Sequence, residues 1–317
     1  MKCFYHNDMD GRASGFCVHA WAGLTDLEKY EPEFIQINYG IDFPFDKIGK
    51  DELVYIVDFS ISPAEMLRLL EITKDVIWID HHKTAIEKYA DFPHYIRGIR
   101  KDGEAGCVLT WKYLHWYTGR GTGPEDFTIT EKDRPGLEVP LFIRLIGDRD
   151  IWAWKLGEQT KLFHAAAQAN NTDPDSEFWW KCMGHEVDPN VGPGNKNYHE
   201  KGLIFWENLM KAGRTIEQYR EQYYKDYRSE LSFPVEFEGH KVIAMNVARV
   251  GSEAFGGDAA FKDYPILMPF YFDGTKFTVS LYSKTVDVSE IAKKYGGGGH
   301  KGASGFQCKE LPFADNL

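Results

Sequence analysis

Hydrophobic and polar positions alternate along the first half of the chain in a pattern typical of an α/β protein. Short, mostly apolar runs predict buried strands at residues 3–5, 34–37, 53–57 and 76–79. Helices are predicted at residues 13–22 and at residues 62–72, where Ser-Pro-Ala-Glu is a favourable helix start. Apolar strands that alternate with amphipathic helices indicate a parallel sheet covered on both faces.

The second half of the chain changes character. Residues 156–230 are rich in Trp, Tyr, Lys and Glu, and their pattern is helical over much of this length. Further apolar runs predict strands at residues 242–245, 266–268 and 277–281. A short helix is expected at residues 288–294.

These patterns predict two α/β domains and a connector. The N-terminal, parallel-sheet domain would occupy residues 1–155, and a smaller C-terminal domain residues 231–317. A helical connector over residues 156–230 would join them. We expect the two domains to face each other across a cleft.

The charge of the chain narrows the range of partners. The chain has 37 Lys and Arg against 48 Asp and Glu, and its formal net charge is −11. Proteins that hold long duplex nucleic acid usually carry a basic surface, because neutralisation of phosphates drives that binding. We therefore expect no long duplex as a partner, and any nucleic-acid substrate should be short.

Cysteine content and hydropathy favour a cytoplasmic protein. The five cysteines are odd in number and lack the paired spacing of a zinc site or a disulfide framework. The first residues contain no apolar signal core. No run of about 18 apolar residues predicts a membrane span. We therefore expect a cytoplasmic location and no membrane partner.

Acidic residues follow the ends of several predicted strands. These residues and their adjoining histidines are Asp8, Asp10, Asp58, Asp80, His81 and His82. In open parallel sheets, ligands bind outside the carboxyl ends of the strands. A single aspartate at such a place is often a cap or a turn residue. Three such positions on one sheet indicate a metal site instead.

A fourth acidic cluster, Gly147-Asp148-Arg149-Asp150, follows a helix-like apolar stretch. Either aspartate could supply an oxygen ligand, or the cluster could be a helix end with an ion pair. Carboxylates and imidazoles together suit manganese, iron, cobalt or zinc. The four clusters offer enough ligands for two cations, an arrangement that activates water for in-line phosphoryl displacement. Asp58, alone at its strand end, is the candidate for a bridging ligand.

The ordered series His6-x-Asp8-x-Asp10-Gly11, Asp58, Asp80-His81-His82 and Asp148 resembles the motifs of DHH superfamily phosphoesterases. This superfamily includes RecJ exonucleases, nanoRNase/pAp phosphatases, cyclic-dinucleotide phosphodiesterases and family II inorganic pyrophosphatases. Residues 296–306, Gly-Gly-Gly-Gly-His-Lys-Gly-Ala-Ser-Gly-Phe, resemble the substrate-binding motif of the DHH-associated C-terminal domain. The resemblance covers nearly the whole chain, and the NrnB-like oligoribonuclease and cyclic-nucleotide phosphodiesterase group is the nearest subgroup.

The resemblance implies a ligand set for two divalent cations, manganese first and magnesium, cobalt or zinc as alternatives. The implied ligands are Asp8, Asp10, Asp58, His81 and Asp148. Asp80 and His82 complete the triplet as implied catalytic residues, with His82 against the substrate phosphate. In a related pattern a metal-binding histidine lies four residues before the first aspartate, where this chain has Phe4. His6, two residues before Asp8, either ligates or supports the site from outside.

The glycine-rich segment predicts a clamp for the substrate phosphate. Backbone N–H groups in a glycine-rich turn can approach phosphate oxygens closely. Charged donors at His300 and Lys301 would strengthen that contact. The expected substrate-binding residues are Gly297, Gly298, Gly299, His300, Lys301 and Ser304, with Arg249 as a second candidate.

Together these features predict a metal-dependent phosphoesterase that hydrolyses short oligonucleotides to mononucleotides. One alternative is a small-molecule phosphatase or cyclic (di)nucleotide phosphodiesterase with the same site, acting on small phosphorylated nucleotides such as pAp. The other alternative is a regulatory nucleotide-binding protein whose metals are structural or absent. A homodimer is a further expectation.

Overall fold

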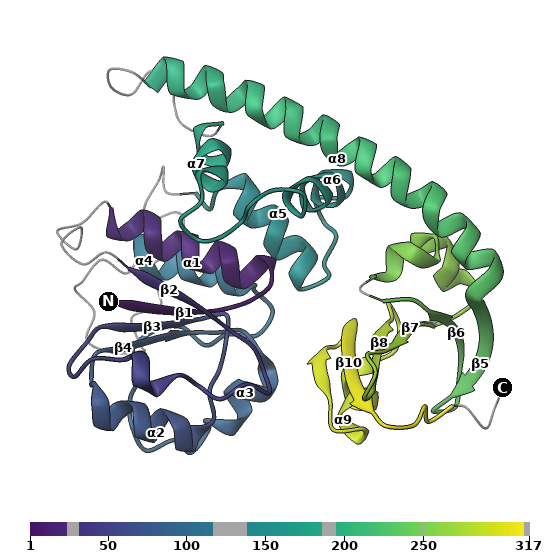
Figure 1. The fold of residues 1–317 in the computed structure, drawn as a ribbon, viewed down its shortest axis with the longest axis horizontal. Helices are drawn as coiled ribbons and strands as arrows, with labels where there is room; N and C mark the ends of the chain where they lie inside the picture. Colours follow the sequence, from purple (N-terminus) through teal and green to yellow (C-terminus); the bar gives the residue numbers. More distant parts are fainter. Residues whose placement is uncertain (24–31, 117–137, 186–194, 249, 314–317) are drawn as a thin grey trace. The chain divides into compact units, whose positions relative to one another are not determined.

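The computed structural model of the chain describes residues 1–23, 32–116, 138–185, 195–248 and 250–313. The chain forms two compact units, Met1–Gly213 and Arg214–Leu317. Each unit has its own sheet and its own hydrophobic core (Figure 1).

Four parallel strands form the sheet of the first unit. They are β1 (Lys2–His6), β2 (Glu33–Ile37), β3 (Val54–Val57) and β4 (Val76–Ile79). Their order is β2-β1-β3-β4. All residues of β3 and β4 are buried, because helices cover both faces of the sheet. The predicted parallel sheet is confirmed, and the carboxyl ends of β1, β3 and β4 are neighbours at one edge.

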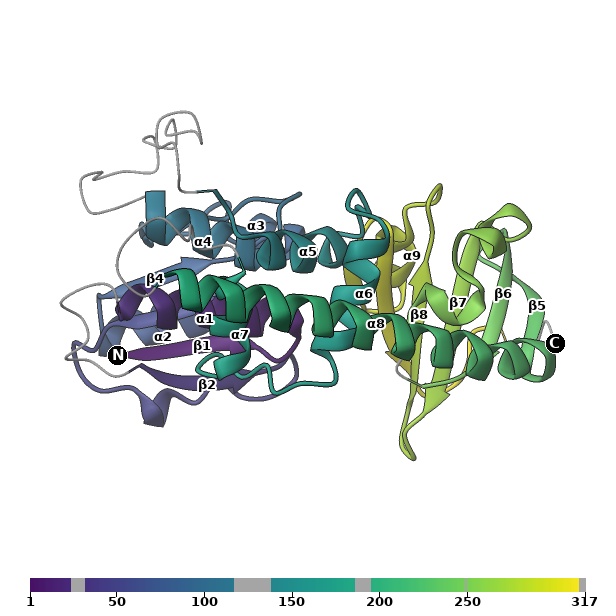
Figure 2. The same cartoon turned by 90° about the horizontal axis from the view of Figure 1, so that it is seen from above.

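Helices lie on both faces of this sheet. They are α1 (Met9–Ala22), α2 (Pro63–Ile72), α3 (Lys83–Lys88), α4 (Gly106–Trp116), α5 (Leu141–Asp150), α6 (Glu158–Ala167) and α7 (Glu177–Gly184), with a 3-10 turn at Phe45–Lys47. Figures 1 and 2 show α1, α4 and α5 on one face, and Figure 1 shows α2 on the other. Phe16, Phe142 and Trp179 belong to the core on the first face, and Phe4 and Trp78 to the core on the second.

Local chemistry explains where three of these helices begin and end. α2 begins as predicted, because Ser62 and Glu65 form a capping box around Pro63. α1 starts before its predicted bound, because Asp8 Oδ1 accepts a hydrogen bond from the Gly11 N–H at 2.9 Å. α5 continues through Asp150, so the fourth acidic cluster is the last turn of a helix.

The helix α8 (Asn195–Leu231) contains the division between the two units, which falls after Gly213. Residues 156–230, expected as a connector, include α6, α7 and most of α8. Among the residues that the structure describes, no helix is long and apolar enough to cross a membrane.

The second unit is built on a mixed sheet in the order β5-β6-β7-β8-β10-β9. The strands are β5 (Ser232–Phe237), β6 (His240–Asn246), β7 (Ile266–Phe272), β8 (Phe277–Tyr282), β9 (Gly298–His300) and β10 (Ala303–Cys308). Short 3-10 turns span Ser252–Phe255 and Gly257–Lys262, and α9 (Val288–Lys294) packs on the sheet as the predicted helix. Strand β9 was not predicted, because its glycines show no pattern typical of a strand. This strand is formed by its antiparallel pairing with β10.

Candidate metal centre

The first unit gathers its acidic residues and histidines at the carboxyl edge of its sheet. His6 ends β1, Asp58 follows β3, and Asp80, His81 and His82 follow β4. Asp8 and Asp10 lie at the start of α1, and Asp150 ends α5. The structure thus brings together residues that are up to 144 positions apart, from His6 to Asp150.

One group of possible ligands consists of His6, Asp8 and Asp58. His6 Nδ1 lies 2.7 Å from Asp8 Oδ2 and 3.8 Å from Asp58 Oδ2. Burial disfavours a charged imidazole, but the contacts with Asp58 and Asp8 outweigh it and raise the pKa of His6 to about 10. The proton on His6 thus balances part of the negative charge of Asp8 and Asp58, which a bound cation would otherwise neutralise.

A second group surrounds the ring of His81. Its Nε2 atom lies 3.1 Å from Asp58 Oδ1, 3.4 Å from Asp150 Oδ2 and 3.5 Å from Asp10 Oδ2. Three carboxylate oxygens and one imidazole nitrogen therefore converge on one small volume. Asp58 belongs to both groups, with one oxygen toward each, and its role as a bridging ligand stays a prediction.

Several oxygens in these groups are buried without a hydrogen bond. Within the described parts of the chain, neither oxygen of Asp58 has a hydrogen-bond partner, and Asp150 Oδ2 has none. Burial and the carboxylates of Asp10 and Asp8 raise the pKa of Asp58 well above its usual range. Burial and Asp10 raise the pKa of Asp150 in the same way. Buried carboxylate oxygens without hydrogen bonds are costly in a folded protein, and the donor set suits divalent cations such as manganese or zinc.

Backbone groups of α4 hold one carboxylate in place. Asp10 accepts hydrogen bonds from the N–H groups of Gly106 and Cys107, both at 2.7 Å. The first turn of a helix favours negative charge, which offsets the burial of Asp10. A Cβ atom on Gly106 would lie 2.7 Å from Asp58 Cβ, so only glycine lets α4 approach the centre this closely.

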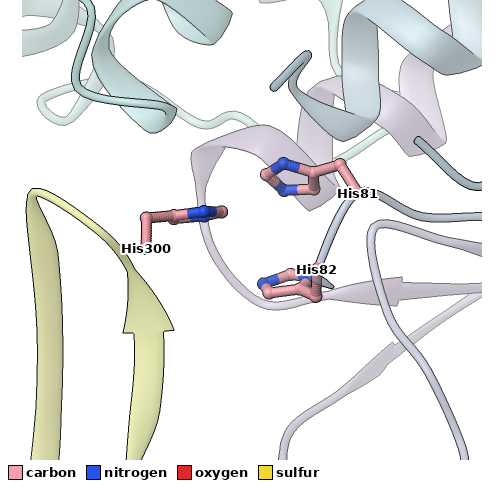
Figure 3. Close-up of side chains that lie close together, drawn as sticks. All are labelled: His81, His82 and His300. Carbon is pink, nitrogen blue, oxygen red and sulfur yellow. The ribbon is translucent and has the colours of Figure 1, made fainter. Parts of the chain in front are cut away.

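Asp80 and His82 form a separate, fully paired unit beside the centre. Asp80 Oδ1 accepts from the backbone N–H of His81 at 2.8 Å and lies 2.7 Å from His82 Nδ1, while Ser60 Oγ donates to Asp80 Oδ2. Burial opposes ionisation of Asp80, but the His82 contact lowers its pKa below the usual range. The ionised carboxylate can only accept, so Nδ1 carries the proton and the ring orientation is set. Figure 3 shows the rings of His81 and His82 on the segment after β4.

The structure does not bring Asp148 into the centre. Its carboxylate accepts hydrogen bonds from Lys155 N at 2.7 Å, Leu156 N at 3.0 Å and Thr160 Oγ1 at 2.5 Å. Residues two apart on a helix point about 200° apart, so Asp150 faces the cluster when Asp148 faces the start of α6. Asp150 occupies the position for which the sequence motif implied Asp148.

The glycine-rich segment forms a hairpin in the second unit. Gly298 and Gly299 lie in β9, which ends at His300, the residue labelled in Figure 3. Ser304 lies in β10. Ser304 Oγ is buried without a hydrogen-bond partner in the described structure. Arg249, the other expected phosphate contact, lies outside the described residues.

Two contributors to the centre were missed by sequence reasoning. Ser60 fixes Asp80, and Gly106 admits α4 beside Asp58. Neither residue stands in a motif, and both act through contacts between elements that are distant in sequence.

No family model matches this chain. The uncharacterized protein R106 of Acanthamoeba polyphaga mimivirus is 23% identical over 278 residues, covering 84% of this chain and 55% of that protein, so this chain spans about half its length. Oligoribonuclease NrnB of Bacillus subtilis is 22% identical over 312 residues, covering 95% of this chain and 71% of that protein.

A solved DHH domain, from a member of a family of ribosomal proteins, shares the fold. Its TM-score is 0.50 with 16% identity, over 96% of this chain and 81% of that one. The fold is therefore that of DHH-domain proteins. The ordered motifs and the similarity to NrnB agree with the resemblance to DHH superfamily phosphoesterases.

Asp58→Asn should stabilise the metal-free protein and abolish its stabilisation by metal. The amide removes a buried charge whose oxygens have no hydrogen bonds, and asparagine suits the φ of +53° at this position. The pKa of Asp58 is raised in the folded state, so the parent protein loses stability as the pH rises through that pKa. The stability gained by Asp58→Asn should therefore be largest above that pKa. We expect a gain of about 1 kcal/mol without metal by urea unfolding.

In the parent protein, manganese at about 100 times its Kd should add roughly 2.7 kcal/mol, and in Asp58→Asn it should add almost nothing. Asp46→Asn, the same change at an exposed residue of the first unit, is the control and should behave like the parent. Equal stabilisation by metal in the parent and in Asp58→Asn would contradict the assignment.

Asp148 and Asp150 should respond oppositely to substitution. Asp148→Ala leaves two backbone N–H groups and the Thr160 hydroxyl without their acceptor, so the free energy of unfolding should fall by about 2 kcal/mol. Asp150→Asn should weaken metal binding at least about tenfold with little loss of stability. Titration of metal into the folded variants measures this, and the reverse pattern would restore Asp148 as the ligand.

Proposed function

We propose that this protein is a metal-dependent phosphoesterase that hydrolyses short oligonucleotides to mononucleotides. The main observation behind this proposal is that Asp10, Asp58 and Asp150 converge on His81 Nε2, next to the His6–Asp8 pair. Unpaired, buried carboxylate oxygens of this kind are expected of a metal centre and are costly in any other role. Structural carboxylates in the same unit, Asp80 and Asp148, are fully paired by contrast.

Two cation positions follow from the two ligand groups. His6, Asp8 and Asp58 would hold one cation, and Asp10, Asp58, His81 and Asp150 the other, manganese being our first choice for these donors. When bound, two such cations supply an activated water molecule and neutralise the charge that develops on the phosphoryl oxygens.

The protein's own groups complete the chemistry at the open edge of the centre. Side chains of Asp8 and His82 are 43% and 22% exposed, whereas Asp58 and His81 are about 1% exposed. A substrate phosphate can therefore approach from the side of Asp8 and His82. With Nδ1 directed to Asp80, the other edge of the His82 ring is placed to hold a phosphate oxygen or to donate a proton to the leaving oxygen.

Two considerations support short oligonucleotides as the substrate. NrnB, similar over 95% of this chain, is named an oligoribonuclease. The net charge of −11 disfavours a long polyanion. A small phosphorylated nucleotide or a cyclic (di)nucleotide would use the same centre, and a regulatory nucleotide-binding role remains the alternative of another class. A homodimer in the cytoplasm stays a prediction.

We also propose that the β9–β10 hairpin binds a substrate phosphate. The glycines at 297 and 299 are explained by packing within the hairpin: an added Cβ would meet Gly305 O at 2.1 Å and Ser304 Cα at 2.6 Å, respectively. Gly298 has open space around it, and the Ser304 hydroxyl lacks a partner within the described residues. Gly298, Ser304, His300 and Lys301 are thus the groups that a ligand would contact.

Purified protein with manganese should cleave 5′-labelled RNA of two to five nucleotides to mononucleotides, and a chelator should abolish this. Asp58→Asn should lower kcat/KM at least about a hundredfold, while Asp46→Asn should retain it. Turnover of only pAp or a cyclic nucleotide would keep the centre and overturn the substrate. Bound metal without turnover of any of these compounds would favour the regulatory role.

Gly298→Ala should raise the KM for the preferred substrate severalfold without lowering stability. The new methyl group meets no protein atom within 4 Å, so its effect would come from the space that a phosphate occupies. Thermal unfolding provides the stability control. An unchanged KM would argue against this hairpin as a phosphate site.

A further inference from the structure

An exposed tyrosine lies at the open edge of the metal centre. Tyr39 follows β2, and 55% of its surface is accessible. It occupies the second position of a tight turn, in which the Ile41 N–H donates to Asn38 O at 3.4 Å and Gly40 has a φ of +84°. Such a turn requires a residue that tolerates positive φ at its third position, and it presents Tyr39 on a short, constrained backbone.

The ring of Tyr39 contacts three other rings of the first unit. It stacks on Phe59 with centroids 4.5 Å apart, and it lies 5.7 Å from the ring of His6 and 6.2 Å from that of His82, edge to face. Phe59 is buried and supports the stack from below. Tyr39 is therefore next to His6, a candidate ligand, and to His82, which borders the approach to the centre.

Neither the metal ligands nor the phosphate contacts account for this exposure. A single exposed aromatic ring needs no explanation by itself, but one that lies beside a candidate phosphate site, against His6 and His82, is in position to contact an aromatic part of the ligand. A phosphate held at His82 would carry its nucleoside within reach of a ring about 6 Å away. Pyrophosphate or another ring-free phosphate would gain nothing from Tyr39.

We propose that Tyr39, backed by Phe59, is the stacking platform for one nucleobase of the substrate. This inference rests on the proposed function, which it deepens: the centre selects phosphates that bear an aromatic base. Stacking on an aromatic side chain tolerates every base, because each has a flat π-face. Tyr39 is thus a specificity residue that favours nucleotides over ring-free phosphates and reads no sequence.

Equilibrium binding tests the platform without requiring turnover. In calorimetry with manganese present, the parent protein should bind AMP about tenfold more tightly than ribose 5-phosphate, the same molecule without its base. Tyr39→Leu keeps apolar bulk but loses the aromatic face, so it should reduce this ratio to near one. Tyr39→Phe should preserve the ratio, and Ile41→Ala is the control for an exposed apolar change in the same turn.

Comparing the two ligands separates stacking from support of the neighbouring histidine. If Tyr39 served only to pack against His6, Tyr39→Leu would weaken AMP and ribose 5-phosphate equally and leave their ratio intact, which would overturn the proposal. Equal affinity of the parent for both ligands, or an effect of Ile41→Ala as large as that of Tyr39→Leu, would overturn it as well.

Hydrolysis assays then distinguish a failure of the stacking proposal from a failure of the proposed enzymatic function. Cleavage of dinucleotides with no change of the binding ratio in Tyr39→Leu would keep the enzyme and reject the platform. A lost ratio in Tyr39→Leu without hydrolysis by the parent would keep the platform and reject the enzyme.

Discussion

The parallel pairing of β1, β3 and β4 is the constraint on which the rest of the structure depends. Neighbouring strands lie about 4.8 Å apart, so residues that follow their ends must converge. Asp8, Asp10 and Asp58 converge here in this way, and Asp150 joins them from the end of α5, with His6 and His81 among them. Two divalent cations carry the four positive charges that would balance four ionised carboxylates, which is why the arrangement fits a pair of cations better than one.

The first unit treats its buried carboxylates in two different ways. Asp80 and Asp148 are paired by backbone and hydroxyl donors, and they hold a histidine ring and a helix start in place. Asp58 and Asp150 have oxygens with no such donors in the described chain, and their raised pKa values record that cost. The carboxylates of the centre lower the stability of the metal-free protein, and the sheet with its two hydrophobic cores stabilises it. Such a trade-off is common at functional sites.

The residues of the centre differ in how exposed they are to solvent. The deepest ligands, Asp58 and His81, are enclosed, while Asp8, His82 and Tyr39 border the approach. A ligand that reaches the carboxylates must therefore pass groups that suit a phosphate and an aromatic ring. This combination supports the proposed nucleotide substrate over inorganic phosphate alone.

The sequence by itself determined the parallel sheet and the start of α2, and it singled out Asp8, Asp10, Asp58 and His81, which the structure brings together. Apolar runs and strand-end aspartates are local signals, and the motif order links them. Only the tertiary structure decided between Asp148 and Asp150, because the helical phase of α5 and the position of α6 determine which carboxylate faces the centre. The roles of Ser60, Gly106 and Tyr39 were equally hidden, since each acts through a contact between elements that are far apart in the chain.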